Sequence, residues 1–166
     1  MRRAHKRKVA PEKAVDPRAV RVAAVALLAG RDFSSGELRH KLESKGYDAG
    51  VVAEAVAELV EGRLVDDTRY AEHYVAYHAD RGQGPIRILG GLKALGLPAE
   101  IIEEALAAGP SWPAIAREVR IRKFGLQAPG SWAEKGRQAR FLQYRGFSSD
   151  HIRAALDGDF DPDEPS

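Results

Sequence analysis

The chain has 166 residues, of which 44% are hydrophobic and 30% charged, a balance typical of a globular protein. It contains no cysteine, which excludes disulfides and thiolate metal sites, and its formal net charge is +2. No apolar run approaches the ~18 residues of a membrane-spanning helix, and no signal-peptide pattern follows the basic N-terminus. We therefore expect a cytoplasmic protein without membrane contact, built as one compact domain or a few small modules.

The small net charge is the sum of segments with opposite charge along the sequence. Residues 1–8 carry basic side chains and no acid, and residues 157–166 carry acidic side chains and no base. Tails of one sign are typically solvated, so we expect a basic disordered tail over 1–16 and an acidic one over 158–166. The range 48–80 is mainly acidic and 117–145 mainly basic. The basic range is either a solvated helix face or the footprint of a polyanionic partner.

Between the tails the periodicity is helical throughout, and no stretch alternates like a strand. The first predicted unit, 17–64, contains helices over 19–29, 35–45 and 49–61. Ser34 fits the N-cap of the middle helix, with Glu37 at the position of a capping box. The unit therefore reads as three short helices joined by tight turns.

The second predicted unit, 65–109, contains helices over 67–81, 85–95 and 98–107. Asp66 fits the N-cap of the first helix, and Val65 and Tyr70 fit a hydrophobic staple around it. Asp66 and Asp67 are adjacent carboxylates that suit acid–base chemistry, but helix capping accounts for both of them. We interpret the segment as the start of an amphipathic helix.

The third predicted unit, 110–157, contains helices over 113–124, 132–144 and 149–156. Aromatic side chains accompany its basic residues, namely Trp112, Trp132, Phe141 and Tyr144. They either stack on single-stranded bases or belong to the core. The core interpretation is favoured, because Phe141 and Tyr144 lie three residues apart on a helix that must pack.

The same turn pattern occurs three times at an interval of 50 residues, at Gly46, Gly96 and Gly146. A leucine precedes each glycine by four residues, and a cap-type residue follows it by two. Each glycine fits the C′ position that ends a helix, where positive φ costs it little. The sequence predicts an all-α fold of three tandem three-helix repeats, resembling helix-turn-helix units, that stack into an elongated, curved array.

Motifs for catalysis are missing from the sequence. The segment 81–85 is a helix-to-helix turn and not a phosphate-binding loop. The histidines, of which His73 and His78 are five residues apart, do not have the spacing of a helical metal pair. We expect a protein that is not an enzyme, with no catalytic residues, no metal and no cofactor.

Three motifs occur together in the first two units: Leu38-Arg39-x-Lys41-Leu42-x-x-Lys45-Gly46-Tyr47, Leu64-Val65-Asp66-Asp67-x-Arg69-Tyr70-Ala71, and Arg81-Gly82-x-Gly84-Pro85-x-Arg87-Ile88. With the turn glycines, they resemble the RecX family, the bacterial regulatory proteins that modulate the RecA recombinase. The resemblance covers roughly 18–157. We interpret its signature residues as mainly structural: Asp66, Asp67, Arg69, Tyr70, Gly46, Gly96 and Gly146.

This resemblance implies tandem three-helix repeats that bind along the RecA–DNA filament as a monomer. It also implies inhibition of the RecA ATPase and strand exchange, regulation of DNA repair and recombination, and contact with DNA, mainly single-stranded DNA inside the filament. The middle unit departs from the family pattern, because its second helix is apolar and contains Gly90 and Gly91. The basic side chains are concentrated instead in the third unit.

Candidate DNA- or filament-binding residues are therefore the basic side chains of the third unit, with support from the first: Arg117, Arg120, Arg122, Lys123, Arg137, Arg140, Arg145, Arg39, Lys41 and Lys45. The acidic 48–72 surface is a candidate for a basic surface of RecA. The alternative function is a helix-turn-helix-like module that binds single- or double-stranded DNA without RecA. A helical scaffold for another protein is the third possibility.

Overall fold

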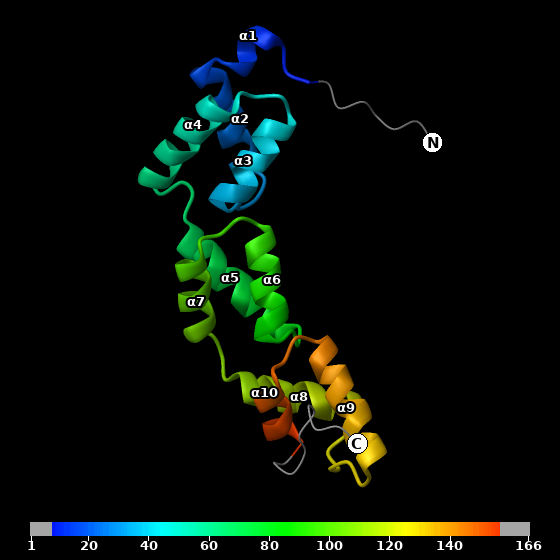
Figure 1. Ribbon diagram of the computed structural model, residues 1–166. Coiled ribbons are helices and arrows are strands. Elements are labelled where there is room, and N and C mark those ends of the chain that lie inside the picture. The colour runs from blue at the N-terminus through cyan, green and yellow to red at the C-terminus, as the bar shows by residue number, and fades with distance from the viewer. Residues whose placement is uncertain (1–7, 157–166) are drawn as a thin grey trace, which may run out of the picture. The chain divides into compact units, whose positions relative to one another are not determined.

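The computed structural model describes residues 8–156, so residues 1–7 and the predicted acidic tail lie outside the described residues. Figure 1 shows that the described chain is helical, with no strand among these residues. This confirms the predicted all-α fold of three-helix repeats. The helices are α1 (Pro11–Ala14), α2 (Pro17–Leu28), α3 (Ser35–Ser44), α4 (Ala49–Glu61), α5 (Asp67–Asp80), α6 (Pro85–Ala94), α7 (Ala99–Ala107), α8 (Trp112–Phe124), α9 (Trp132–Tyr144) and α10 (Ser149–Ala155).

The chain divides into two compact units, Met1–Tyr70 with Leu95–Leu97, and Ala71–Ala94 with Pro98–Ser166. We call them unit 1 and unit 2. The division falls inside α5 and not between repeats, and Asp67 of α5 and Leu95 both accept hydrogen bonds from residues at the start of α3. The predicted repeat boundaries and the curved array stay predictions.

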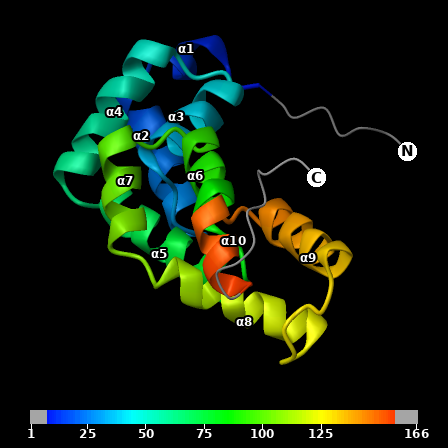
Figure 2. The same cartoon turned by 60° about the horizontal axis from the view of Figure 1, so that its bottom comes forward.

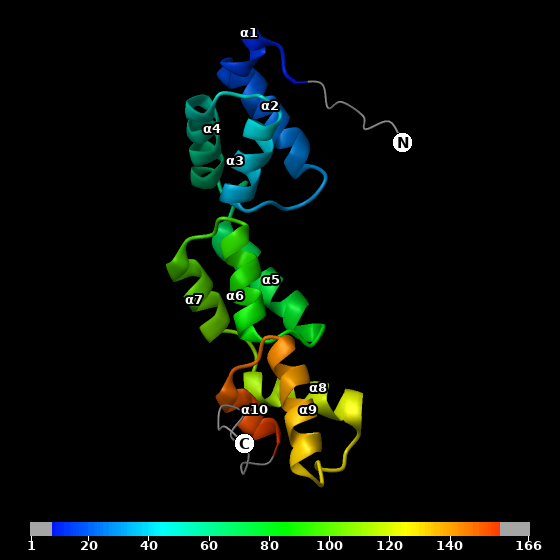
Figure 3. The ribbon, with the colours of Figure 1, turned by 45° about the vertical axis from the view of Figure 1, so that its right-hand side comes forward.

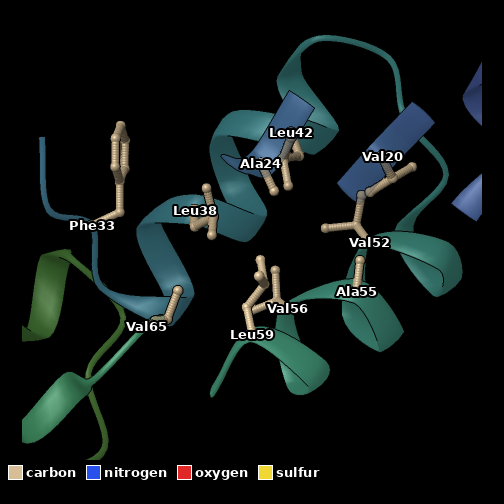
Figure 4. Close-up of a cluster of buried hydrophobic side chains, with 10 residues drawn as sticks. All are labelled: Val20, Ala24, Phe33, Leu38, Leu42, Val52, Ala55, Val56, Leu59 and Val65. Atoms are coloured by element: carbon tan, nitrogen blue, oxygen red, sulfur yellow. The ribbon is translucent and has the colours of Figure 1, made fainter. Parts of the chain in front are cut away.

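The first repeat is organised around a cluster of buried aliphatic side chains from α2, α3 and α4 (Figure 4). Leu38 and Leu42 of α3 lie one helical turn apart and are fully buried, as are Val52 and Leu59 of α4. Burying a side chain of this size stabilises the fold by about 1.5–3 kcal/mol. The cluster supplies the core that the helical periodicity predicted.

The N-terminal segment takes part in this repeat, although the sequence analysis assigned residues up to 16 to a tail. The backbone N–H of Val9 donates to the carbonyl of Lys45 at 3.1 Å, and that of Asp48 donates to the carbonyl of Ala14 at 2.9 Å. Residues 11–14 form α1 between these contacts. Residues 9–14 are therefore not part of a disordered tail, because backbone hydrogen bonds tie them to the turn after α3.

Each second helix of a repeat ends in a glycine with positive φ. The values are +102° at Gly46, +75° at Gly96 and +97° at Gly146. The N-cap of the next helix stands two residues later, and the side chains of Asp48 and Ser148 accept hydrogen bonds from backbone N–H groups in the first turns of α4 and α10. The recurring turn is thus present in all three repeats.

The carbonyl that precedes each turn glycine accepts a hydrogen bond from an earlier segment of the chain. The pairs are Val9 N to Lys45 O at 3.1 Å, Ser34 Oγ to Leu95 O at 2.7 Å, and Gly84 N to Arg145 O at 2.8 Å. In the last two pairs, the start of one repeat's second helix meets the end of the next repeat's second helix. A Cβ added at Gly36 would lie 2.8 Å from the carbonyl oxygen of Gly96, so only glycine fits there.

Asp66 and Asp67 have different roles, whereas the sequence analysis assigned both to capping. Asp66 Oδ1 accepts from the backbone N–H of Arg69 at 3.0 Å, which is a cap of α5. Asp67 instead accepts from the backbone N–H of Ser35 at 2.7 Å and from its hydroxyl at 2.6 Å. Asp67 therefore joins the start of α5 to the start of α3.

The helices of the second repeat, α5, α6 and α7, are seen together in Figure 3. Gly91 permits close packing there, because a Cβ at this position would overlap the phenol of Tyr74, while a Cβ at Gly90 would meet nothing within 4 Å. The third repeat (Figure 2) has its own cluster, in which Leu142, Phe147 and Ile152 are almost fully buried. No helix within 8–156 has the length and apolarity that crossing a membrane requires.

Candidate nucleic-acid interface

A cleft lined by cations lies within unit 2, and we call it the cationic cleft. Its volume is about 180 Å³, and its lining residues are Arg81, Gly82, Val119, Arg122, Lys123, Phe141 and Arg145. Arg81 follows the end of α5, Arg122 and Lys123 lie on the last turn of α8, and Phe141 and Arg145 lie at the end of α9. Two repeats therefore contribute to one site.

Close approach of the backbone at Gly82 brings Arg81 to this position. Gly82 ends α5 with a φ of +74°, and a Cβ added there would lie 2.8 Å from Val119 Cγ2 of α8. A side chain at residue 82 would push the end of α5 away from α8. On the other side, the guanidinium of Arg145 donates to the carbonyl of Arg81 at 3.4 Å.

Phe141 forms an aromatic wall of the cleft beneath two of its cations. Lys123 Nζ lies 5.9 Å from the centroid of the ring, and Arg145 Cζ lies 5.4 Å from it. Phe124 meets the same ring edge-on, with centroids 5.4 Å apart and planes at 89°. The ring therefore fixes the directions in which Lys123 and Arg145 present their charges.

Among residues 8–156, no acidic side chain forms a salt bridge with a cation of the cleft. The salt bridges of these residues involve Arg21, Arg31, Arg69 and Arg153 instead. Burial lowers the pKa of the neighbouring His78, and the charges of Arg81 and Arg87 lower it as well. Cations gathered without carboxylates attract a polyanion, for which phosphate groups are the general biological example.

The predicted binding residues fall into three groups. Arg122, Lys123 and Arg145 line the cleft, and Arg117, Arg137 and Arg140 are exposed on α8 and α9. Arg39 and Lys45 are exposed and Lys41 is half-buried, but these three belong to unit 1 and line no part of the cleft.

Arg120 is a correction to the predicted set. Its side chain is only 3% exposed, and its guanidinium donates to the carbonyl of Gln127 at 3.1 Å and to Gln138 Oε1 at 3.5 Å. It faces inward because it lies on the side of α8 that meets Gln138 of α9 and Gln127 of the loop between the two helices. Arg120 thus anchors that loop and is not available to a partner.

Arg81 and Arg87 are absent from the predicted binding residues, because the sequence pattern places Arg81 in a turn and Arg87 in the predicted helix over 85–95. The backbone N–H of Gly84 donates to the carbonyl of Arg145 at 2.8 Å, and that of Ile86 donates to the carbonyl of Gly146 at 3.0 Å. These bonds hold the start of α6 against the end of α9. The only sequence signal for this approach was the small residue Gly84, where a Cβ would overlap the backbone of Gly146 and Phe147.

The aromatic residues also differ from the core interpretation. Tyr144 is 76% exposed and Trp132 is 64% exposed, whereas Phe141 is half-buried against the third-repeat cluster. Trp112 is half-buried, and its indole N–H donates to the carbonyl of Leu106 at 3.3 Å. The prediction that Tyr144 is a core residue is therefore wrong, because α9 already buries Gln138, Ala139 and Leu142 on another face.

The fold and the cleft define an all-α protein of tandem three-helix repeats with a cleft lined by cations. Three family models match the chain: the first, second and third three-helix domains of RecX, over residues 21–59, 66–106 and 114–156. The chain belongs to the RecX family.

Named relatives agree with this assignment. The chain is 44% identical over 147 residues to a protein of Halorhodospira halophila named Regulatory protein RecX, covering 88% of this chain and 91% of that protein. It is 39% identical to the protein of the same name from Pseudomonas syringae pv. tomato, over 86% and 92% of the two chains. The crystal structure of RecX from Lactobacillus salivarius has the same fold, with a TM-score of 0.73 at 22% identity over 84% of this chain and 94% of that one.

Proposed function

We propose that this protein binds RecA and the DNA inside the RecA filament, and that it inhibits the ATPase and strand-exchange activities of RecA. Such inhibition regulates DNA repair and recombination. The observation that carries the proposal is membership of a family whose members are named regulatory proteins. The cationic cleft supports the DNA part of it, because its charges have no carboxylate partners among the described residues.

A regulator of this kind needs no active site. A monomer of helical repeats laid along the filament would hold neighbouring RecA subunits against the movements of their ATP cycle, or promote their release. Basic side chains of α8 and α9 would face DNA, and exposed acids of α4, such as Glu54, Glu58 and Glu61, would face basic parts of RecA. A cytoplasmic location belongs to the proposal, and the lack of cysteine in the chain agrees with it.

The first test is the DNA-dependent ATPase of RecA on single-stranded DNA, titrated with this protein at fixed salt. Inhibition at well below one protein per RecA is the expected result, because a modulator that acts on a filament affects several subunits. Absence of inhibition at an excess over RecA would refute the proposal.

A pair of charge reversals tests the third repeat. Arg137→Glu with Arg140→Glu should weaken the inhibition while leaving the helical circular dichroism unchanged, because both side chains are exposed on α9. Lys13→Glu with Arg18→Glu changes the net charge equally on exposed positions of unit 1 and serves as the control. Full inhibition by the α9 variant would remove the third repeat from the interface.

A DNA-binding module that acts without RecA is the second candidate function, and one observation favours it. The cationic cleft is complete within a single compact unit and needs no other protein to form it. Binding to bare DNA that falls steeply with salt, together with no effect on RecA, would establish this alternative. Neither effect would leave a helical scaffold for another protein.

A further inference from the structure

Tyr144 is the most exposed aromatic side chain of the described residues, and it stands on a basic helix face. On α9, Arg137, Arg140 and Tyr144 follow at i, i+3 and i+7, so they share one side of the helix. All three are exposed. The large ring contributes little to the core, and its position among cations is unusual for a residue with only a structural role.

A second repeat supplies a cation to this ring. Arg87 of α6 places Cζ 5.5 Å from the centroid of Tyr144. The position of Arg87 is fixed, because a Cβ at Gly146 would lie 2.7 Å from the backbone nitrogen of Arg87, and the Ile86 N–H donates to the Gly146 carbonyl at 3.0 Å. The backbone contact between α6 and the turn after α9 therefore places Arg87 next to Tyr144.

The ring lies next to the cationic cleft. Phe141 and Arg145, which line the cleft, are three residues before and one residue after Tyr144 on the same helix. Three residues of helix correspond to about 4.5 Å along the axis. The ring is therefore carried by the same helical turn that supplies Phe141 and Arg145 to the cleft.

We propose that Tyr144, with Arg87, stacks an unpaired base of single-stranded DNA while the adjoining phosphate occupies the cationic cleft. This inference rests on the proposed function and names the form of DNA and the contact it makes. An unpaired base offers an open face to the ring, whereas a duplex presents only the edges of its bases in the grooves. An acidic peptide would use the cations but would gain nothing from the exposed ring.

The repeat itself indicates that Tyr144 is not needed for folding. Ser44 and Ala94 occupy the same position in the first two repeats, two residues before Gly46 and Gly96. Both are followed by the same turn with positive φ. The variant Tyr144→Ala therefore reproduces what the second repeat already contains.

The test measures binding of the full chain to a fluorescein-labelled oligothymidine of about 20 nucleotides and to a duplex of equal length, by anisotropy over a range of salt. Tyr144→Ala should weaken single-strand binding about tenfold, because stacking on an aromatic side chain carries roughly that effect per base. It should leave duplex binding and the salt slope of single-strand binding unchanged. Tyr144→Phe keeps the ring and should restore single-strand binding.

Lys123→Gln should change the salt dependence of single-strand binding, which Tyr144→Ala should leave unchanged. Its loss of one phosphate contact should lower the slope of log affinity against log salt by about 0.7 on single strands. Trp132→Ala is the matched aromatic control, since Trp132 is also exposed on α9 but lies about a third of a turn round the helix from Tyr144. It should bind like the unchanged protein.

Single-strand binding by Tyr144→Ala equal to that of the unchanged protein would overturn the proposal, as would equal losses on single strand and duplex. Competition by polyglutamate as effective as by oligothymidine of the same charge would assign the surface to an acidic protein partner instead. The RecA ATPase is measured alongside. If the protein inhibits RecA but binds DNA equally well without Tyr144, the stacking proposal is refuted and the proposed function is not. If the protein fails to inhibit RecA, the proposed function is refuted, and the stacking proposal is decided by the DNA-binding data alone.

Discussion

Replacing Gly84 with alanine should separate the start of α6 from the end of α9, and with it the two halves of the cationic cleft. A Cβ at residue 84 would overlap backbone atoms of Gly146 and Phe147, which have no side-chain freedom to absorb the overlap. To relieve this overlap, the start of α6 must move away from the end of α9. The movement stretches the bonds from Gly84 N to Arg145 O, now 2.8 Å, and from Ile86 N to Gly146 O, now 3.0 Å.

The expected cost follows from these contacts. Two backbone hydrogen bonds contribute about 1 kcal/mol each in net terms, and overpacking of a closely packed site costs about 1–3 kcal/mol. The sum is about 3–5 kcal/mol, a large part of the ~5–15 kcal/mol by which a typical domain is stable. Urea unfolding followed by circular dichroism measures it, and hydrogen exchange of the Gly84 and Ile86 amides shows where the structure opens.

Gly90→Ala is the matched control in the same helix. Its Cβ would meet nothing within 4 Å, so the substitution should stabilise the protein by about 1 kcal/mol through helix propensity alone. The reasoning fails if Gly84→Ala is as stable as the unchanged protein, or if the Gly84 and Ile86 amides keep their protection in it. A loss of stability in Gly90→Ala would equally contradict the reasoning, because it would mean that the space around residue 90 does not accommodate a Cβ.

Further predictions concern the caps and junctions. Asp67→Ala should lower the free energy of unfolding by about 2 kcal/mol, because Asp67 accepts two bonds from Ser35, while Asp66→Ala should cost about 1 kcal/mol as a lost cap; urea unfolding of the two variants compares them. Burial lowers the pKa of His151, whose Nδ1 accepts from the Ser148 N–H, so the unfolded chain binds the proton more readily. Stability should therefore fall as the pH falls through about 6.5, and His151→Gln, which keeps an acceptor for the cap, should make the thermal midpoint less dependent on pH; equal slopes for the two proteins would refute this role.

The repeat architecture was predictable because its signals are local. The turn glycines, the leucines four residues before them and the capping residues after them each act within one helical turn of the backbone. Gly46 is an example, since its positive φ of +102° was expected from the sequence pattern alone. Such features depend on neighbours in the sequence and not on how repeats meet.

The cleft was not predictable in the same way, because it depends on backbone approaches between residues far apart in the sequence. Arg81 and Arg87 gain their roles only when Gly84 docks on the turn after α9, some 60 residues later. Arg120 shows the converse, since its charge suggested a partner but its packing against Gln138 and the loop after α8 buries it. The helical periodicity alone does not decide which arginines are exposed, because the basic range 117–145 contains more arginines than one face of α8 or α9 presents to solvent.

The comparison of the three turns separates what the backbone requires from what the side chains add. The carbonyls of Lys45, Leu95 and Arg145 accept an incoming hydrogen bond in every repeat, whatever side chain they carry. Because the acceptor is a backbone carbonyl in each repeat, the side chains at these positions and at those just before them are free to vary. The second repeat uses Ala94 and Leu95 there, and the third uses Tyr144 and Arg145, which bring an aromatic ring and a cation to the same place on the repeat. The proposed binding surface on the third turn therefore does not depend on the contact that joins this turn to α6, and substitutions taken from the second repeat should remove that surface while retaining the junction.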